Sequence, residues 1–223
     1  MPDRLSIPVA DRQTTGLAYT ADSARRIGAT LVLGHGAGAG QTSGFMVQVA
    51  KGLAARGVDV LTFNFLYTEQ RRKAPDRTEV LEACYRAAVA AARSHAAFAG
   101  NKVFVGGKSM GGRIASHLAA AGDETAAALS GLVLLGYPLH PPGRPDQLRV
   151  AHLPNIRVPV LVIQGERDPF GSPEELRPHF AALGSRATIH VVAGGDHSLA
   201  VRGGGRVQAA LEETVAAWIA NAA

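Results

Sequence analysis

The sequence is short of cysteine, of aromatic residues and of long apolar runs. Its 223 residues include a single cysteine, Cys84, which excludes an intramolecular disulfide and any zinc site built from cysteines. No run approaches the roughly 18 apolar residues that a membrane-spanning helix needs. The N-terminal stretch MPDRLSIPVADRQ lacks the apolar segment of a signal peptide. We therefore expect a cytoplasmic protein that does not enter a membrane.

Positive charge is in excess, but its distribution does not indicate a nucleic-acid-binding protein. The net charge is +5, and the 23 Lys and Arg residues are spread along the whole chain, with the densest run at Arg71–Lys73. Aromatic residues make up 5% of the sequence, too few for platforms on which bases could stack. We interpret the basic residues as a solvated surface and expect no nucleic-acid partner.

Apolar runs of β type alternate with alanine-rich helical stretches, which is typical of a mostly parallel sheet with helices on both faces. The length suits one α/β domain over residues 1–223. Leu5–Val9 and Leu17–Tyr19 predict an antiparallel pair at the sheet edge. The predicted parallel strands are Ala29–Gly34, Val58–Phe63, Lys102–Val105, Gly131–Leu135, Val160–Ile163 and Thr188–Val192. The predicted helices are Ser43–Arg56, Arg77–Ala99, Met110–Ala121, Pro173–Leu183 and Arg206–Ala220. The proline-rich connection between Tyr137 and Pro159 is too short for a lid domain.

The stretch FVGGKSMGGR, residues 104–113, fits two incompatible motifs. Its GKS resembles the end of a phosphate-binding P-loop, but that motif needs an earlier glycine where the chain has Lys102, within a predicted strand. The segment GKSMG is also G-x-S-x-G, a sharp turn from strand to helix that presents a nucleophilic serine. A strand precedes it, a helix follows it, and the flanking glycines let chain segments pass closely. The sequence therefore predicts Ser109 as a nucleophile.

A nucleophilic serine needs a histidine as base and a carboxylate to orient that histidine. Proteins that present serine on such a turn carry the acid and then the histidine later in the chain, after further strands. Asp168 follows the strand VLVIQG, and His197 follows the strand IHVVAGG. Glu166 is a second candidate for the acid. Asp196 is too close to His197 in sequence to orient it, so we expect Asp196 to hold the loop.

Backbone N–H groups must also point at the oxygen on which negative charge develops. Met110 directly follows the serine and supplies one such group, and we assign the second to Ala37 in the glycine-rich loop Gly34–Gly40. This loop also matches the dinucleotide-binding pattern G-x-G-x-x-A. That fold needs an acidic residue at the end of the next strand, and this strand ends in TFNF instead.

Several motifs together resemble the α/β-hydrolase fold, and more specifically small lidless serine hydrolases close to dienelactone hydrolases. The motifs are HGAGAG, FNFLY, GGKSMGGR, GYPLHPPGRPDQLR, HLP, QGERDPFG and GGDHS, which cover nearly the whole chain. The resemblance implies a hydrolase with the triad Ser109, Asp168 and His197. Dienelactone hydrolases use a cysteine nucleophile, whereas this chain has Ser109 at that position, so their substrate is not carried over. Some similar proteins are chromatin-complex subunits without established catalysis, which leaves a catalytically silent binding or scaffold protein as the alternative.

These residues lead us to expect a carboxylesterase-like enzyme that cleaves a small ester, thioester or lactone as a monomer or homodimer. The mechanism implied requires no metal ion and no organic cofactor. The basic residues near the predicted site leave two alternatives open. Arg113 or the Arg71–Lys73 run could attract an anionic substrate, or these side chains could simply be solvated and form ordinary salt bridges. Residues predicted to contact substrate are His35, Gly36, Tyr67, Arg113 and Tyr137.

Overall fold

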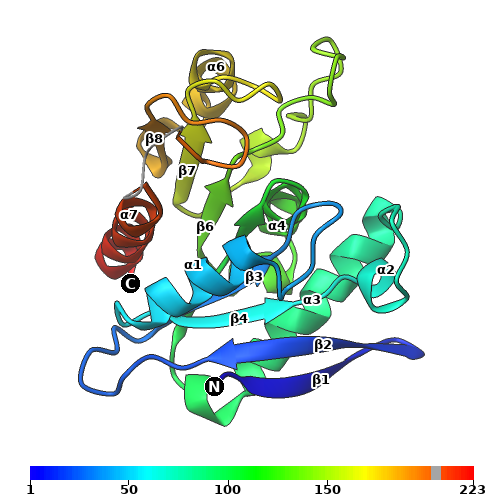
Figure 1. Ribbon diagram of the computed structural model, residues 1–223, viewed down its shortest axis with the longest axis vertical. Coiled ribbons are helices and arrows are strands. Elements are labelled where there is room, and N and C mark those ends of the chain that lie inside the picture. Colours follow the sequence, from blue (N-terminus) through cyan, green and yellow to red (C-terminus); the bar gives the residue numbers. More distant parts are fainter. Residues whose placement is uncertain (202–206) are drawn as a thin grey trace.

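The predicted strands assemble into one eight-stranded sheet in the computed structural model, which describes residues 1–201 and 207–223. The strands are β1 (Asp3–Val9), β2 (Arg12–Tyr19), β3 (Ala29–Gly34), β4 (Asp59–Phe63), β5 (Lys102–Lys108), β6 (Leu129–Leu135), β7 (Val160–Gly165) and β8 (Ala187–Val192). Their order across the sheet is β1-β2-β4-β3-β5-β6-β7-β8. β1 and β2 pair antiparallel, as predicted, and β2 pairs antiparallel with β4. The six strands from β3 to β8 run parallel to one another (Figure 1).

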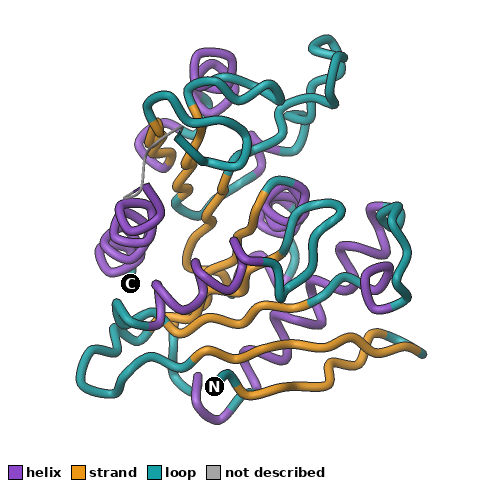
Figure 2. Tube along the Cα trace, viewed as in Figure 1, coloured by secondary structure: helices purple, strands orange, loops and turns teal. Residues whose placement is uncertain are grey.

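Helices follow most of the parallel strands, as expected for strands joined by crossovers (Figure 2). They are α1 (Gly44–Ala54), α2 (Leu66–Glu69), α3 (Thr78–Ser94), α4 (Met110–Ala120), α5 (Glu124–Ala127), α6 (Pro173–Ala181) and α7 (Val207–Ala222), with 3-10 turns at Ala96–Phe98, Leu153–Asn155 and Gly184–Arg186. α1 and α7 contact each other and cover one face, while α3 and α4 contact each other and cover the other. The connection from β6 to β7 holds only the 3-10 turn at Leu153–Asn155, so no lid domain forms there.

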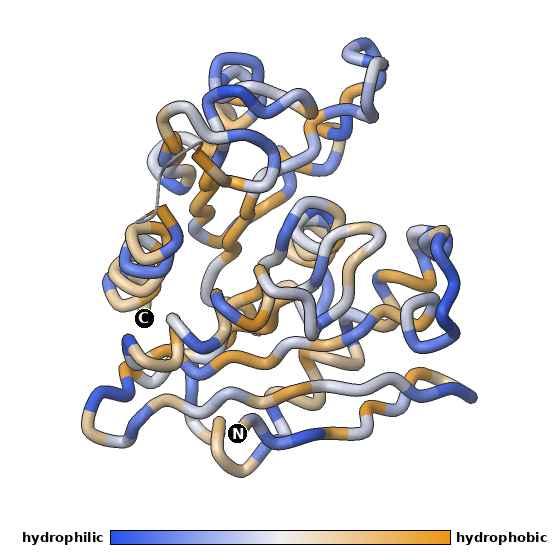
Figure 3. The backbone as a smooth tube through the Cα atoms, viewed as in Figure 1, coloured by the Kyte–Doolittle hydropathy of each residue, from blue (hydrophilic) through white to orange (hydrophobic). Residues whose placement is uncertain are grey.

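The two covered faces explain why three central strands are buried along their whole length. β3, β4 and β7 are buried at every residue, because side chains on both sides of the sheet meet helices. One apolar core lies under α3, α4 and α6, and a second lies under α1 and α7. Figure 3 shows hydrophobic residues along the central strands and hydrophilic residues in the outer connections.

Several boundaries differ from the sequence prediction. The helix predicted over Arg77–Ala99 ends at Ser94, because His95 adopts an extended backbone and a 3-10 turn follows. β5 runs on to Lys108, past the predicted end. α2 and α5 were not predicted, since four residues are too few to show helical periodicity. α7 continues to Ala222, and the predicted start of this helix, Arg206, lies outside the described residues. Within the described ranges, no helix combines the length and apolar character needed to cross a bilayer.

Candidate active site

Ser109 lies at the junction of β5 and α4 in a backbone conformation that non-glycine residues rarely adopt. Its φ is 49° and its ψ is −114°. The turn is tightly packed, because a Cβ atom added at Gly107 would lie 2.4 Å from the Gly34 oxygen, and one added at Gly111 would lie 2.2 Å from that oxygen. Only glycine fits at either position, so β3 can pass directly beside the turn that presents the serine.

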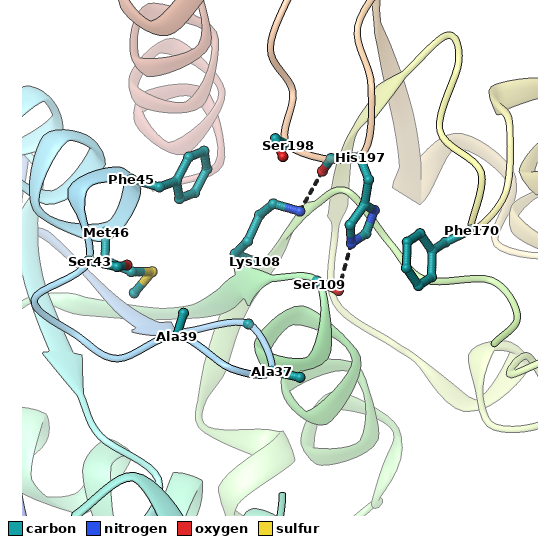
Figure 4. Close-up of a pocket in the computed structure, with 11 residues that line it drawn as sticks. Ala37, Ala39, Ser43, Phe45, Met46, Lys108, Ser109, Phe170, His197 and Ser198 are labelled. Carbon is teal, nitrogen blue, oxygen red and sulfur yellow. Dashed lines mark hydrogen bonds between the residues drawn. The ribbon is translucent and has the colours of Figure 1, made fainter. Parts of the chain in front are cut away.

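His197 links Ser109 to Asp168 through two hydrogen bonds. The Nε2 atom of His197 lies 2.9 Å from the Ser109 Oγ (Figure 4), and its Nδ1 atom lies 2.8 Å from the Asp168 Oδ2. A carboxylate only accepts hydrogen bonds, so Nδ1 donates to Asp168 and Nε2 is left to accept from the Ser109 hydroxyl. The three side chains come from loops that follow β5, β7 and β8, which meet at the carboxyl edge of the sheet.

The buried carboxylate of Asp168 is held in place by bonds to both of its oxygens. Oδ1 accepts from the Phe170 N–H at 2.9 Å, and Oδ2 accepts from the Gln164 Nε2 at 2.8 Å. Gln164 in turn accepts from the Tyr137 N–H and donates to the Gly171 oxygen, each at 2.8 Å. The carboxylate therefore cannot rotate away from His197 without breaking several bonds.

The other acidic residues near this edge have structural contacts instead. Glu166, the second candidate for the acid, accepts from the Gly194 N–H at 2.6 Å and thereby joins the loops after β7 and β8. Asp196 accepts from the Ser198 N–H at 2.8 Å and from the Ala200 N–H at 3.2 Å. Asp196 thus holds the loop that carries His197.

Lys108, the residue before the serine, reaches across to the histidine loop. Its Nζ donates to the backbone oxygen of His197 at 2.6 Å (Figure 4). Burial lowers the pKa of Lys108 to about 8, although Asp168 and Asp196 act in the opposite direction. On the other side of the imidazole, the Phe170 ring stacks on His197 with centroids 4.1 Å apart and an interplanar angle of 29°. The position of His197 is therefore fixed by its backbone, its ring face and both ring nitrogens.

A cavity of about 330 Å³ opens over Ser109 and His197. Phe45 and Met46 from α1 form an apolar wall, and Phe170 lies on the opposite side of the serine and histidine (Figure 4). The residues lining the cavity are Gly36, Ala37, Ala39, Ser43, Phe45, Met46, Lys108, Ser109, Phe170, His197 and Ser198. Its size and walls suit a small, largely apolar group next to the serine.

The two backbone groups expected to bind an oxyanion lie on either side of Ser109. A Cβ added at Gly36 would lie 3.7 Å from the Ser109 Cβ, so the loop that carries Gly36 and Ala37 runs alongside the serine. Met110 is the first residue of α4, where backbone N–H groups have no acceptor one turn earlier in the helix. Both segments can therefore present N–H donors to an atom bound at the serine.

Four of the five residues predicted to contact substrate are not among those lining this cavity, namely His35, Tyr67, Arg113 and Tyr137. His35 is fully buried; it bonds to the Gly36 oxygen at 2.9 Å and accepts from the Phe65 N–H at 3.1 Å, so it braces the glycine-rich loop. Tyr137 is buried and donates to the Arg149 oxygen at 2.6 Å. Arg113 lies near Tyr137 and Glu82. Gly36 does line the cavity.

Cys84 has the environment of a packing residue. Its side chain is fully buried within α3, and burial raises the pKa of the thiol to about 12. A thiol that stays protonated is a weak nucleophile and a weak metal ligand. Within the described ranges, no group of three or more His, Cys, Asp and Glu side chains is placed to hold a metal ion.

Comparison with known proteins places the chain in a family. The family model described as "Alpha/beta hydrolase domain" matches residues 27–222. The chain belongs to this family.

Solved structures of other α/β-hydrolases are similar over nearly the whole chain. An α/β serine hydrolase homologue from Coxiella burnetii is 16% identical with a TM-score of 0.78, and the match covers 97% of each chain. A serine hydrolase without a lid from Xanthomonas campestris is 18% identical with a TM-score of 0.75, over 99% of this chain and 94% of that one. Dienelactone hydrolase from Anabaena variabilis is 19% identical with a TM-score of 0.74, over 99% and 97%. At these identities the likeness establishes the α/β-hydrolase fold.

Several residues of the site were missed by the sequence analysis. Lys108 and Phe170 both lie inside motifs that were recognised, but their contacts with His197 depend on how separate loops meet. Gln164 had a signal of its own, as a polar side chain in the otherwise apolar strand β7. Phe45 and Met46 lie on the first turn of α1 and had no signal beyond the helical pattern.

Proposed function

We propose that this α/β-hydrolase is a serine hydrolase that cleaves a small ester, thioester or lactone through an acyl-enzyme intermediate. The observation that carries the proposal is the continuous hydrogen-bond relay from Ser109 through His197 to Asp168, at 2.9 and 2.8 Å, on the wall of a cavity. A purely structural serine has no need of a strained backbone or of a histidine whose free nitrogen faces its hydroxyl.

In the proposed mechanism Ser109 attacks the carbonyl carbon while the Nε2 of His197 takes the hydroxyl proton. Asp168 holds the imidazole in the required tautomer and stabilises its positive charge. The carbonyl oxygen becomes negative and accepts hydrogen bonds from the N–H groups of Met110 and Ala37. The leaving alkoxide or thiolate takes the proton from His197. A water molecule then attacks the acyl-enzyme by the same route and releases the acid and free Ser109.

The cavity supports the proposed substrate class. A volume of about 330 Å³ with walls from Phe45, Met46 and Phe170 favours short or compact apolar acyl groups. The lidless connection between β6 and β7 leaves the site open, which disfavours the interfacial action of lidded lipases. Structural neighbours named as serine hydrolases and as an esterase domain support the same class.

A fluorophosphonate probe tests the proposal directly, because it phosphonylates only a serine activated by its histidine. The wild-type protein should react at Ser109, identified by intact mass and peptide mapping, and Ser109→Ala should not react. Ser198→Ala is the matched control, since Ser198 lines the same cavity but has no bond to the imidazole in the relay. It should label like wild type. A folded wild-type protein that does not label at all would contradict the proposal, as would labelling that persists in Ser109→Ala.

A further inference from the structure

A second cavity of about 410 Å³ adjoins the one above Ser109. It is lined by Gly38, Ala39, Tyr67, Thr68 and the Arg71–Lys73 segment. Ala39 lines both cavities, and Figure 4 shows it on the loop that also carries Ala37 beside the serine. The two cavities therefore lie next to each other at Ala39.

The charge in the second cavity is positive and largely uncompensated. Arg72 pairs with Asp76, but within residues 1–201 and 207–223 neither Arg71 nor Lys73 has a carboxylate within salt-bridge distance. The segment starts from an ordered turn, because the Arg71 N–H donates to the Thr68 oxygen at 3.0 Å and the Arg72 N–H donates to the Tyr67 oxygen at 2.9 Å. Arg71 thus stands at a fixed backbone position on one wall, and Lys73 adds a second free cation two residues later.

Tyr67 gives an independent sign of a missing partner. Its side chain is 1% exposed, and its hydroxyl is one of two buried side-chain polar atoms in the described part of the chain without a hydrogen-bond partner. Thr68 and the Gly38 backbone lie beside the hydroxyl, but neither completes a hydrogen bond of acceptable geometry. Burial raises the pKa of Tyr67, so the hydroxyl keeps its proton and can donate. An unpaired buried hydroxyl destabilises a protein unless a ligand satisfies it.

We propose that the second cavity binds a dianionic phosphate monoester carried by the substrate of the Ser109 site. Two unpaired cations match the roughly two negative charges of a phosphate monoester at neutral pH better than the single charge of a carboxylate. Tyr67 also lines this cavity, and we assign its buried, unpaired hydroxyl as a neutral donor to the phosphate. The inference rests on the proposed hydrolase function and narrows its substrate to small esters or thioesters with a phosphate on the leaving group.

Binding can be measured without catalysis, using inorganic phosphate as the probe and calorimetric titration as the readout. Phosphate should bind to the wild-type protein and to Ser109→Ala alike, and its affinity should fall about tenfold in the double variant Arg71→Gln/Lys73→Gln. Tyr67→Phe should bind more weakly than wild type and melt at a higher temperature in the absence of phosphate. The charge-matched control is Arg93→Gln/Arg177→Gln, which removes two exposed cations elsewhere on the surface and should bind like wild type.

Kinetics then test whether the bound phosphate belongs to the substrate. Two esters of the same short acyl group are compared, one with a neutral hydroxyalkyl leaving group and one with that hydroxyl phosphorylated. A third ester carries a carboxylate in place of the phosphate. The kcat/KM of wild type should be at least about tenfold higher for the phosphorylated ester than for the neutral one, with the carboxylate between them, and salt should reduce the difference. The double variant should bring the ratio close to one.

The outcomes separate this inference from the proposed function. Hydrolysis of all three esters at equal kcat/KM, with no phosphate binding, would overturn the phosphate site and leave the hydrolase intact. Failure to hydrolyse any ester and to react with fluorophosphonate would overturn the hydrolase, and with it the assignment of phosphate to a substrate. A carboxylate ester preferred over the phosphorylated one would overturn the choice of a dianion.

Discussion

Asp168 determines which nitrogen of His197 carries the proton. In Asp168→Asn the new amide can donate to Nδ1, which places the histidine proton on Nε2, where it can no longer accept the Ser109 proton. We expect kcat for a short-chain ester to fall by about 10⁴, with little change in KM, while circular dichroism shows a normal fold. Glu166→Gln is the control, since Glu166 contacts the Gly194 N–H and not the imidazole. Loss of activity in Glu166→Gln with activity kept in Asp168→Asn would reassign the acid.

Lys108 gives the site a titrating group outside the triad. Its ammonium holds the backbone oxygen of His197 at 2.6 Å, and burial lowers its pKa to about 8. The protonated form is lost as pH rises through that value, and a neutral amine is a weaker donor. We expect kcat/KM of wild type to decline above about pH 8. Lys108→Met keeps the length of the side chain but removes the donor. Its kcat/KM should be lower than that of wild type and should not decline above about pH 8. An alkaline limb unchanged in Lys108→Met would rule out Lys108 as its cause.

At the scale of elements, the contact between β3 and the turn after β5 decides whether Ser109 can be presented at all. In Gly111→Ala the new Cβ would lie 2.2 Å from the Gly34 oxygen and 2.8 Å from the His35 oxygen, both backbone atoms that cannot rotate away. We expect a loss of about 3 kcal/mol in the free energy of unfolding, measured by urea denaturation, and reduced fluorophosphonate labelling. Gly44→Ala, at the start of α1 with no atom within 4 Å of the added Cβ, should be neutral or slightly stabilising.

The sequence was sufficient to predict the strands and helices whose apolar pattern is long and continuous. The central strands β3, β4 and β7 were recognised because helices cover both faces and most of their positions are apolar. The edge pair β1 and β2 was recognised in part, and the structure extends both strands. Helix ends were less predictable, since α3 stops at Ser94 through a backbone change at His95 that has no glycine or proline to mark it.

Within the site, the sequence predicted the residues whose role depends on their immediate neighbours in the chain, and missed those whose role depends on contacts with distant segments. Ser109, Met110, Asp168 and His197 occupy motifs whose neighbours in sequence define their geometry. Tyr85 shows the opposite case. Its hydroxyl oxygen lies 2.7 Å from the Val32 oxygen and 2.6 Å from the Gly106 oxygen, with one hydrogen shared between them, and it accepts from the Gly106 N–H at 2.9 Å, so Tyr85 joins β3 to β5 beneath the serine turn. In the sequence it is one apolar position of a helix, and only the packing of α3 against the sheet gives it this role.

At the scale of the whole molecule, a partly buried polar cluster connects α3, α4 and the long connection between β6 and β7. The Nε2 atom of His152 in that connection lies 2.7 Å from the Ser116 Oγ, which itself donates to the Arg113 oxygen at 2.6 Å. The His152 ring lies 4.2 Å from that of His117. His117 in turn bonds to the Glu82 carboxylate on α3 at 2.8 Å. Arg113 adds a positive charge nearby. Polar side chains take the place of apolar packing at this junction. Protonation of the cluster therefore affects the stability of the contact between α3, α4 and the connection from β6 to β7.

His152 makes this junction sensitive to acid. Burial, then the nearby charges of His117 and Arg113, lower the pKa of His152 from 6.5 to about 3. The unfolded chain binds a proton on this side chain near pH 6.5, whereas the folded protein does so only near pH 3, so between these values the unfolded state binds more protons. Stability contributed by the neutral imidazole is therefore present above pH 6.5 and is lost progressively as the pH falls toward 3. Burial also lowers the pKa of His117, which acts in the same direction.

We expect the melting temperature of wild type to decline from pH 6.5 downward, with a shallower decline in His152→Gln, because the glutamine amide can hydrogen-bond to the Ser116 Oγ without taking up a proton. The exposed His190 on β8 provides the control, and His190→Gln should keep the wild-type dependence. Differential scanning fluorimetry from pH 4 to 8 measures all three proteins under one protocol. If His152→Gln loses stability with acid as steeply as wild type, the acid sensitivity arises elsewhere, and the cluster holds the three segments together independently of its charge.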